Sequence, residues 1–224
     1  MKPERIGVTL ATVFGLTLLH ACGGDQASSG SPREVAKGGD DKTGGYDFVA
    51  DWWKAAPNHD SIWGWGEIGG VAVDNPDRII VATWGDQKAD GELKDPVTNL
   101  IVVADRNGNI VDRWTQWDSV MYWPHQVYIN PYDPERHIWV VERDRAQVLK
   151  FTNDGSELVM RIGDPDHPRT QEEARANPNP GPYSYGMPAV LAFLPDGSFY
   201  LGDGYWNSRV IKYDAEGEYL MEWG

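Results

Sequence analysis

The feature that most constrains the fold is a repeated pair of short β-prone segments joined by a polar turn that closes on glycine. The pairs span residues 100–114, 148–163 and 210–224, and their turn glycines are Gly108, Gly155 and Gly217. Turns such as Asn107-Gly108 tolerate the positive φ that tight hairpins need. Another pair of β-prone segments precedes each hairpin, so each repeat predicts four antiparallel strands, the unit of a β-propeller.

The repeats therefore predict an all-β fold with about three propeller blades. The blades fall at about residues 62–116, 123–163 and 187–224, and residues 164–185 form a long polar loop between the second and the third. A closed propeller has about four to eight blades, and an incomplete ring leaves strand edges uncovered. We therefore expect the sequence to be a fragment that covers the front half of a propeller.

The N-terminal region has the organisation of a bacterial export signal. Its uncharged, mostly apolar run at residues 6–19 is shorter than the roughly 20 residues of a membrane-spanning helix. The segment Leu19-His20-Ala21-Cys22 resembles the lipobox of bacterial lipoproteins, and Cys22 is the only cysteine in the chain. We predict a lipoprotein signal peptide at residues 1–21 and lipidation of Cys22. An ordinary signal peptide followed by a chance cysteine is the alternative.

The remaining chain divides into a tether and a domain. Residues 22–45 are rich in Gly, Ser, Asp and Lys, which predicts a flexible linker because little can be buried there. Residues 46–224 then form the partial propeller, held at the bacterial cell envelope by the lipid anchor. The net charge of −14, with a pI near 4.6, excludes nucleic acid as a partner and leaves the anchor as the attachment to the membrane.

The third repeat resembles a known family of blades. Residues 186–224 are similar to an NHL repeat, with a Pro-led inner strand, a Pro-Asp-Gly turn and the pattern Asn-x-Arg-Val-x-x-Tyr. Within the NHL group the chain looks most like peptidyl-α-hydroxyglycine α-amidating lyase (peptidylamidoglycolate lyase). This resemblance rests on Tyr122-Trp123-Pro124-His125, on residues 138–141 and 147–151, and on Asp-Gly-Tyr-Trp-Asn-Ser-Arg at residues 203–209.

The resemblance implies a six-bladed NHL propeller with a zinc ion held by three histidines and a structural calcium. Such an enzyme cleaves peptidyl-α-hydroxyglycine to a peptide amide and glyoxylate. His125 matches the first zinc ligand and Tyr205 the catalytic tyrosine, while Val71 and Val127 match residues whose backbone carbonyls bind calcium. The other two zinc histidines are expected in blades beyond Gly224.

Two departures from the family pattern support a different class of function. Trp84 stands where the family has an arginine, and it cannot supply charge to a developing oxyanion. Gln126 stands where a glycine is usual, beside the predicted zinc ligand. The alternative is a non-catalytic propeller that binds a peptide, a small molecule or a protein on its channel face at the cell envelope. A lactonase-type hydrolase is a third option, but its calcium ligands are not evident.

Several other residues are assigned structural roles. Asp203 and Arg209 are expected to link the loops of neighbouring blades. Most tryptophans are expected to pack as wedges between blades. Three histidines are predicted to lie on the surface without partners at metal spacing: His59, His137 and His167.

Overall fold

The computed structural model describes residues 49–56, 58–177 and 180–224. The predicted signal peptide, Cys22 and the linker lie outside these residues, so those assignments stay predictions. All the described strands and helices belong to one compact unit, Ala50–Gly224. Within the described residues, no helix is long and apolar enough to cross a bilayer.

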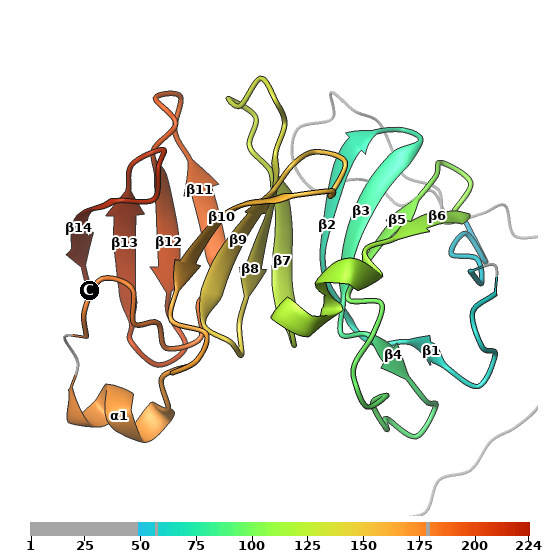
Figure 1. Cartoon of the computed structure of the whole chain (residues 1–224), viewed down its shortest axis with the longest axis horizontal. Coiled ribbons are helices and arrows are strands. Elements are labelled where there is room, and N and C mark those ends of the chain that lie inside the picture. Colours follow the sequence, from blue (N-terminus) through green and yellow to red (C-terminus); the bar gives the residue numbers. More distant parts are fainter. Residues whose placement is uncertain (1–48, 57, 178–179) are drawn as a thin grey trace, which may run out of the picture. The chain divides into compact units, whose positions relative to one another are not determined.

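The described chain forms three four-stranded antiparallel sheets that follow one another along the sequence (Figure 1). The first contains β2 (Ile68–Asn75), β3 (Arg78–Thr83), β5 (Ile101–Ala104) and β6 (Ile110–Arg113). The second contains β7 (Pro124–Ile129), β8 (Ile138–Glu142), β9 (Gln147–Phe151) and β10 (Leu158–Gly163). The third contains β11 (Val190–Phe193), β12 (Phe199–Asp203), β13 (Arg209–Tyr213) and β14 (Tyr219–Trp223).

In each sheet the strands pair in chain order, which is the up-and-down arrangement of a propeller blade. The all-β prediction is confirmed, and the three four-stranded sheets lie within the three predicted blade ranges. Two short strands, β1 (Gly64–Trp65) and β4 (Asp86–Gln87), pair beside the first blade. A 3-10 helix, η2 (Thr115–Val120), connects the first blade to the second.

The predicted turn glycines adopt the backbone conformation that the hairpins require. Gly108, Gly155 and Gly217 have φ angles of 79°, 75° and 86°, which side chains with a Cβ rarely adopt. Gly155 has a second constraint, because a Cβ there would lie 2.2 Å from Cε2 of Trp114. The turn of the second blade therefore packs directly on a tryptophan that follows the first blade.

The hydrophobic core lies between neighbouring blades. One cluster joins the first two blades, with Trp114 and Phe151 among its fully buried members. A second cluster joins blades two and three around Trp139, Phe199 and Tyr213. Trp114 and Trp139 are 1% and 2% exposed, which confirms their expected role as wedges.

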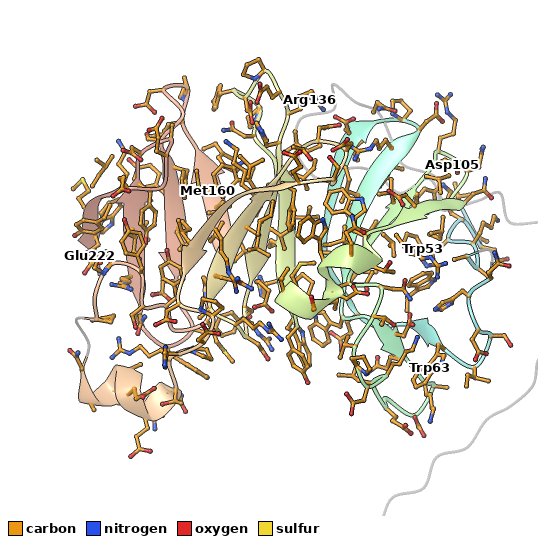
Figure 2. The ribbon with its side chains drawn as sticks, viewed as in Figure 1. Trp53, Trp63, Asp105, Arg136, Met160 and Glu222 are labelled. Atoms are coloured by element: carbon orange, nitrogen blue, oxygen red, sulfur yellow. The ribbon has the colours of Figure 1, made fainter. Side chains whose placement is uncertain are left out.

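Polar contacts also connect the first two blades, on the side where their β2–β3 and β7–β8 turns lie. Arg136, labelled in Figure 2, donates from Nε to Oδ1 of Asp74 at 2.7 Å. Arg78 donates from Nη1 to Oδ1 of Asn153 at 3.1 Å. These contacts join residues more than 60 positions apart, so they fix the orientation of one blade against the next.

The insertion between blades two and three is more ordered than the predicted polar loop. It contains α1 (Gln171–Ala176), which begins with a capping box between Thr170 and Glu173. Tyr185, at the end of the insertion, is 1% exposed, and its hydroxyl lies 2.8 Å from that of Tyr213. The insertion therefore contributes an aromatic side chain to the core of blade three.

Candidate functional site

His125 and Tyr205, predicted from separate motifs, lie together at the junction of blades two and three. His125 is the second residue of β7, and Tyr205 follows the end of β12. The distance from His125 Nε2 to the Tyr205 hydroxyl is 3.1 Å, and the two rings meet edge to face with centroids 5.7 Å apart. The fold thus brings two chemically active side chains within hydrogen-bonding distance across 80 residues of sequence.

The second ring nitrogen of His125 determines how the pair shares its proton. Nδ1 lies 3.0 Å from the backbone carbonyl oxygen of Ala189 at the start of blade three. A carbonyl oxygen only accepts, so in the neutral imidazole Nδ1 carries the hydrogen and Nε2 presents its lone pair. The Tyr205 hydroxyl then donates to Nε2. The arrangement prepares the phenol to lose a proton and return it.

A cation that the sequence analysis did not identify lies beside this pair. The guanidinium carbon of Arg143 is 4.9 Å from the ring centroid of Trp123 and 5.9 Å from that of Tyr205. Its Nε donates to Oδ1 of Asp144 at 2.7 Å. Burial alone would lower the pKa of Arg143, but the hydrogen bond and charge of Asp144, together with Tyr205, raise it. The site therefore holds a permanent positive charge.

The position of Arg143 in its blade could have identified it as a site residue from the sequence. Arg143 directly follows β8, as Trp84 directly follows β3, and Tyr205 lies in the corresponding loop of blade three. The aligned motifs pointed only to Trp84 as the place where an arginine would be. Trp84 packs edge to face on Trp123, with centroids 4.3 Å apart. The Trp123 ring thus contacts both Trp84 and Arg143.

Gln126 and Val127 lie where β7 approaches Gly70 of β2 closely, and Val71 is the next residue of β2. A Cβ on Gly70 would lie 2.8 Å from both Gln126 Oε1 and the backbone nitrogen of Val127. Gln126 therefore faces the first blade. Val71 pairs with Val81 and Val127 with Val140, which are equivalent register positions in the two blades. Calcium binding through their carbonyls stays a prediction.

The described residues do not form a complete zinc site around His125. Catalytic zinc takes three protein ligands and an open position, and His125 provides one imidazole. Within the described ranges, the group of three close metal-binding side chains is Asp133, Glu135 and His137, in the β7–β8 turn at the other end of β7. Asp133 accepts from His137 Nδ1 at 2.6 Å and from the Glu135 backbone nitrogen at 3.0 Å, which explains the group as a turn-stabilising network.

The prediction that the other histidines lie free on the surface was wrong for two of the three. His137 is 8% exposed and contacts Asp133 and Glu135. His59 stacks on Trp65 with centroids 4.5 Å apart, and its Nε2 lies 2.9 Å from Oδ1 of the buried Asp86. The environment of His59 comes from residues distant in the sequence, whereas the partners of His137 lie within its own turn. His167, in the insertion, is exposed as expected.

The Asp203–Arg209 ion pair forms, but within one blade. Arg209 Nε donates to Asp203 Oδ2 at 3.0 Å, and the two residues are partners in the β12–β13 register. The expected link between loops of neighbouring blades was therefore wrong. The pair instead closes the loop that carries Tyr205, and Asp203 also accepts from the Gly186 backbone nitrogen at 2.7 Å.

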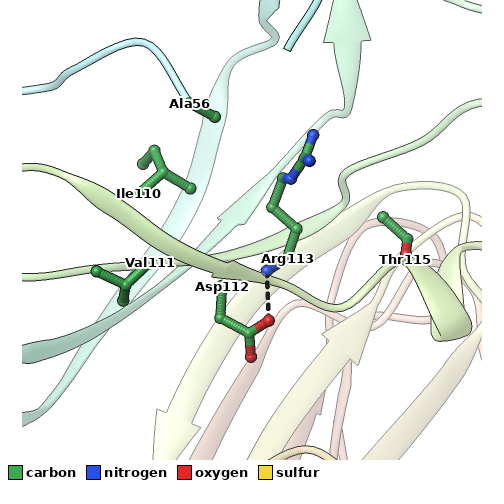
Figure 3. A pocket seen from close by; sticks show the side chains of 6 residues that line it. All are labelled: Ala56, Ile110, Val111, Asp112, Arg113 and Thr115. Atoms are coloured by element: carbon green, nitrogen blue, oxygen red, sulfur yellow. Dashed lines mark hydrogen bonds between the residues drawn. The ribbon is translucent and has the colours of Figure 1, made fainter. Parts of the chain in front are cut away.

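A hollow on the first blade is unrelated to these residues. It has a volume of about 330 Å³ and is lined by Ala56, by Thr115 and by four residues of β6, residues 110–113 (Figure 3). The hydrogen bond drawn there runs from the Arg113 backbone nitrogen to Oδ1 of Asp112 at 2.8 Å. This contact is local to one strand, and none of the predicted site residues lines the hollow.

The fold and the site define a set of propeller-type blades with a histidine, a tyrosine and an arginine at one blade junction. The chain is distantly homologous to amidating lyases. It is 23% identical over 174 residues to peptidyl-alpha-hydroxyglycine alpha-amidating lyase 1 of Drosophila melanogaster, covering 71% of this chain and 29% of the relative. It is 28% identical over 123 residues to lyase 2 of the same organism, covering 54% of this chain and 27% of the relative.

A longer relative is the peptidylglycine alpha-amidating monooxygenase of Rattus norvegicus, 23% identical over 174 residues, which cover 71% of this chain and 16% of the relative. The chain thus spans less than a third of the length of each of these three proteins. No family model matches the chain, so the assignment of the blades to the NHL type stays a prediction.

Solved structures with a similar chain path have low overall superposition scores. The structure of streptogramin B lyase gives a TM-score of 0.37 at 16% identity, covering 70% of this chain and 40% of that chain. The extracellular domain of a putative one component system from B. thetaiotaomicron gives a TM-score of 0.43 at 12% identity, covering 70% of this chain and 18% of that chain.

Proposed function

We propose that this protein is a lyase that cleaves peptidyl-α-hydroxyglycine to a peptide amide and glyoxylate. The observation that carries the proposal is the 3.1 Å contact between His125 Nε2 and the Tyr205 hydroxyl. Two motifs that resemble the amidating lyases independently predicted these residues, and the fold brings them together. The distant homology to proteins named as such lyases supports the same reaction.

The pair supplies the proton transfers that this reaction needs. Transfer of the Tyr205 proton to His125 Nε2 leaves a phenolate, which accepts the proton of the substrate hydroxyl. The hydroxyl oxygen then forms a carbonyl as the C–N bond breaks, and the electron pair goes to the amide nitrogen. A proton returned from the pair completes the peptide amide. The reaction needs no oxidant or reductant.

Zinc and calcium belong to the proposal through the family resemblance. His125 fits the role of a zinc ligand through Nε2, because ligating imidazoles commonly donate their other ring N–H to a carbonyl, as Nδ1 does to Ala189. The same Nε2 cannot bind zinc and accept the Tyr205 proton, so the zinc-ligand role is an alternative to the transfer to His125 described above. As a zinc ligand, His125 would be one of the three that a catalytic zinc requires, so no step is assigned to the metal. The backbone carbonyls of Val71 and Val127 would hold the calcium, which would supply a structural cation.

A second candidate is a non-catalytic propeller that binds a peptide or small molecule on the channel face. The observation that favours it is the packing of Trp84 on Trp123, which builds an aromatic surface where the family has an arginine. Clustered aromatic side chains suit ligand binding without demanding acid–base chemistry.

Export and lipid anchoring complete the proposal. Cys22 would carry the acyl groups, and the protein would act at the bacterial cell envelope. Metabolic labelling with a radioactive fatty acid tests this part, with Cys22→Ser as the variant that should lose both the label and membrane association. Retention of the label in that variant would contradict the anchor.

The activity is tested on the purified full-length protein with α-hydroxyhippurate, by measuring glyoxylate and benzamide release together with the metal content. We expect release in equal amounts and a loss of about 100-fold or more in kcat for Tyr205→Phe. Tyr122→Phe is the matched control, because Tyr122 is also an exposed tyrosine and lies three residues before His125 in the sequence. An inactive wild type that binds the peptide product would support the non-catalytic alternative.

A further inference from the structure

Arg143 is placed to contact an anion at the His125–Tyr205 pair. Its side chain is 18% exposed, and its guanidinium lies against Trp123 and Tyr205. Asp144 accepts only from Nε, while the other guanidinium nitrogens carry four further N–H donors. A planar guanidinium held against aromatic rings loses little additional freedom when it binds a carboxylate.

We infer that Arg143 binds the free carboxylate of the substrate and so determines the specificity of the site for peptides that end in a free carboxylate at the α-hydroxyglycine. This inference rests on the proposed function, because peptidyl-α-hydroxyglycine ends in a carboxylate one bond from the carbon that bears the hydroxyl. With the hydroxyl at Tyr205, the carboxylate lies within reach of a cation that contacts the same ring.

A small cavity lies next to Arg143 on the side of blade three. It has a volume of about 170 Å³, and its lining includes Arg143, Asp144, Met187 and Trp206. This is roughly the space of five to six liquid water molecules at about 30 Å³ each. A carboxylate with its neighbouring carbon fits that space.

Net charge gives a reason for a dedicated cation. The chain carries a formal charge of −14, so its field repels an anionic substrate unless a local positive charge opposes it. Trp84 provides no charge after β3, and Arg143 provides it from the equivalent loop of the second blade. The second blade thus places a positive charge in contact with Trp123.

The other arginines near this junction are already engaged. Arg169 lines the same cavity, but it donates to Asn207 Oδ1 at 2.9 Å and to the backbone oxygen of Glu173 at 2.7 Å. Arg145 donates to the backbone oxygen of Ser119 at 2.9 Å. Of these three arginines, Arg143 is the one whose guanidinium lies over the Tyr205 ring.

The test measures, by calorimetry, the binding of hippurate and of its uncharged analogue hippuramide to the full-length protein. We expect Arg143→Gln to weaken hippurate binding by about 10- to 100-fold and to leave hippuramide binding unchanged. Arg143→Lys should restore part of the loss, because it keeps the charge. Arg145→Gln, in the same loop, is the control and should bind as the wild type does.

An equal loss for both ligands in Arg143→Gln, or no loss for either, would overturn the inference. So would a wild type that binds hippurate no better than hippuramide. Glyoxylate release separates this outcome from the proposed function. Release with a KM independent of Arg143 keeps the lyase and removes the carboxylate site. Arg143-dependent hippurate binding without release keeps the carboxylate site and removes the lyase.

Discussion

Blades two and three differ at one equivalent position, the last residue of the second strand. Glu142 ends β8 and pairs in register with Gln147, while Asp203 ends β12 and pairs with Arg209. Both carboxylates are 0% exposed. Blade three thus neutralises its buried carboxylate with a guanidinium, whereas blade two places an uncharged amide at the same point.

Blade two stabilises its carboxylate with backbone groups instead. Glu142 accepts from the backbone nitrogens of Tyr122, Trp123 and Arg145, so it ties the residues before β7 to the loop that carries Arg143. Burial raises the pKa of Glu142 although these three bonds oppose the change, and the charge of Asp144 raises it further. Blade three holds its functional loop with an ion pair, and blade two with a carboxylate that has no cationic partner among the residues that the structure describes.

The largest expected effect follows from removing the charge of Asp203. The Asp203→Asn variant should lose about 3–5 kcal/mol in the free energy of unfolding, because a buried guanidinium and the Asn207 amide would then face a donor in place of an acceptor. Urea unfolding at neutral pH measures it. Glu222→Gln, which removes the more exposed partner of Arg209, should cost at most about 1 kcal/mol. Similar costs for the two variants would contradict the comparison.

Replacing the carboxylate of Glu142 in blade two by an amide should lower the free energy of unfolding by less than Asp203→Asn does. Glu142→Gln keeps one acceptor oxygen but turns an amide donor toward a backbone N–H, which should cost about 1–2 kcal/mol at neutral pH. No cation is left unpaired, since the register partner Gln147 is uncharged. Urea unfolding against the wild type measures the difference. If Glu142→Gln lowered the free energy of unfolding as much as Asp203→Asn does, the presence of a cationic partner would not explain the difference between the two blades.

The pH dependence should sharpen the contrast further. Because burial raises the pKa of Glu142 in the folded protein, its protonated form is favoured on folding, and this contribution is full below the unfolded pKa. It is lost as the pH rises through the folded value. The cost of Glu142→Gln should therefore be greater at about pH 4.5 than at pH 7. A cost that increases with pH would reverse the sign and refute the assignment.

The smallest change in stability is expected at Tyr205, two residues after Asp203. Tyr205 is 52% exposed, so Tyr205→Phe should change the free energy of unfolding by no more than about 0.5 kcal/mol. Thermal unfolding checks this on the same preparation used for glyoxylate release. A large destabilisation would mean that the pair with His125 supports the fold, and loss of activity could then not be assigned to chemistry.

Local patterns in the sequence were sufficient for the blades. The hairpin turns depend on glycine conformations and on alternating side chains within a few residues, so Gly108, Gly155 and Gly217 could be placed correctly from the chain alone. His125 and Tyr205 could be chosen because each lies in a short motif at a strand end. The helix in the insertion was missed because its single turn and a half lies within an otherwise polar segment.

Contacts between blades could not be read in this way, because they join residues far apart in the chain and depend on how the sheets pack. The 3.1 Å contact between His125 and Tyr205, and the position of Arg143 on Trp123, arise from that packing. Burial of His137 and of the Asp203–Arg209 pair likewise depends on neighbours that no local pattern specifies. The amino-acid pattern thus determined the blades and two members of the site, and tertiary packing decided which side chains meet there and which charge they share.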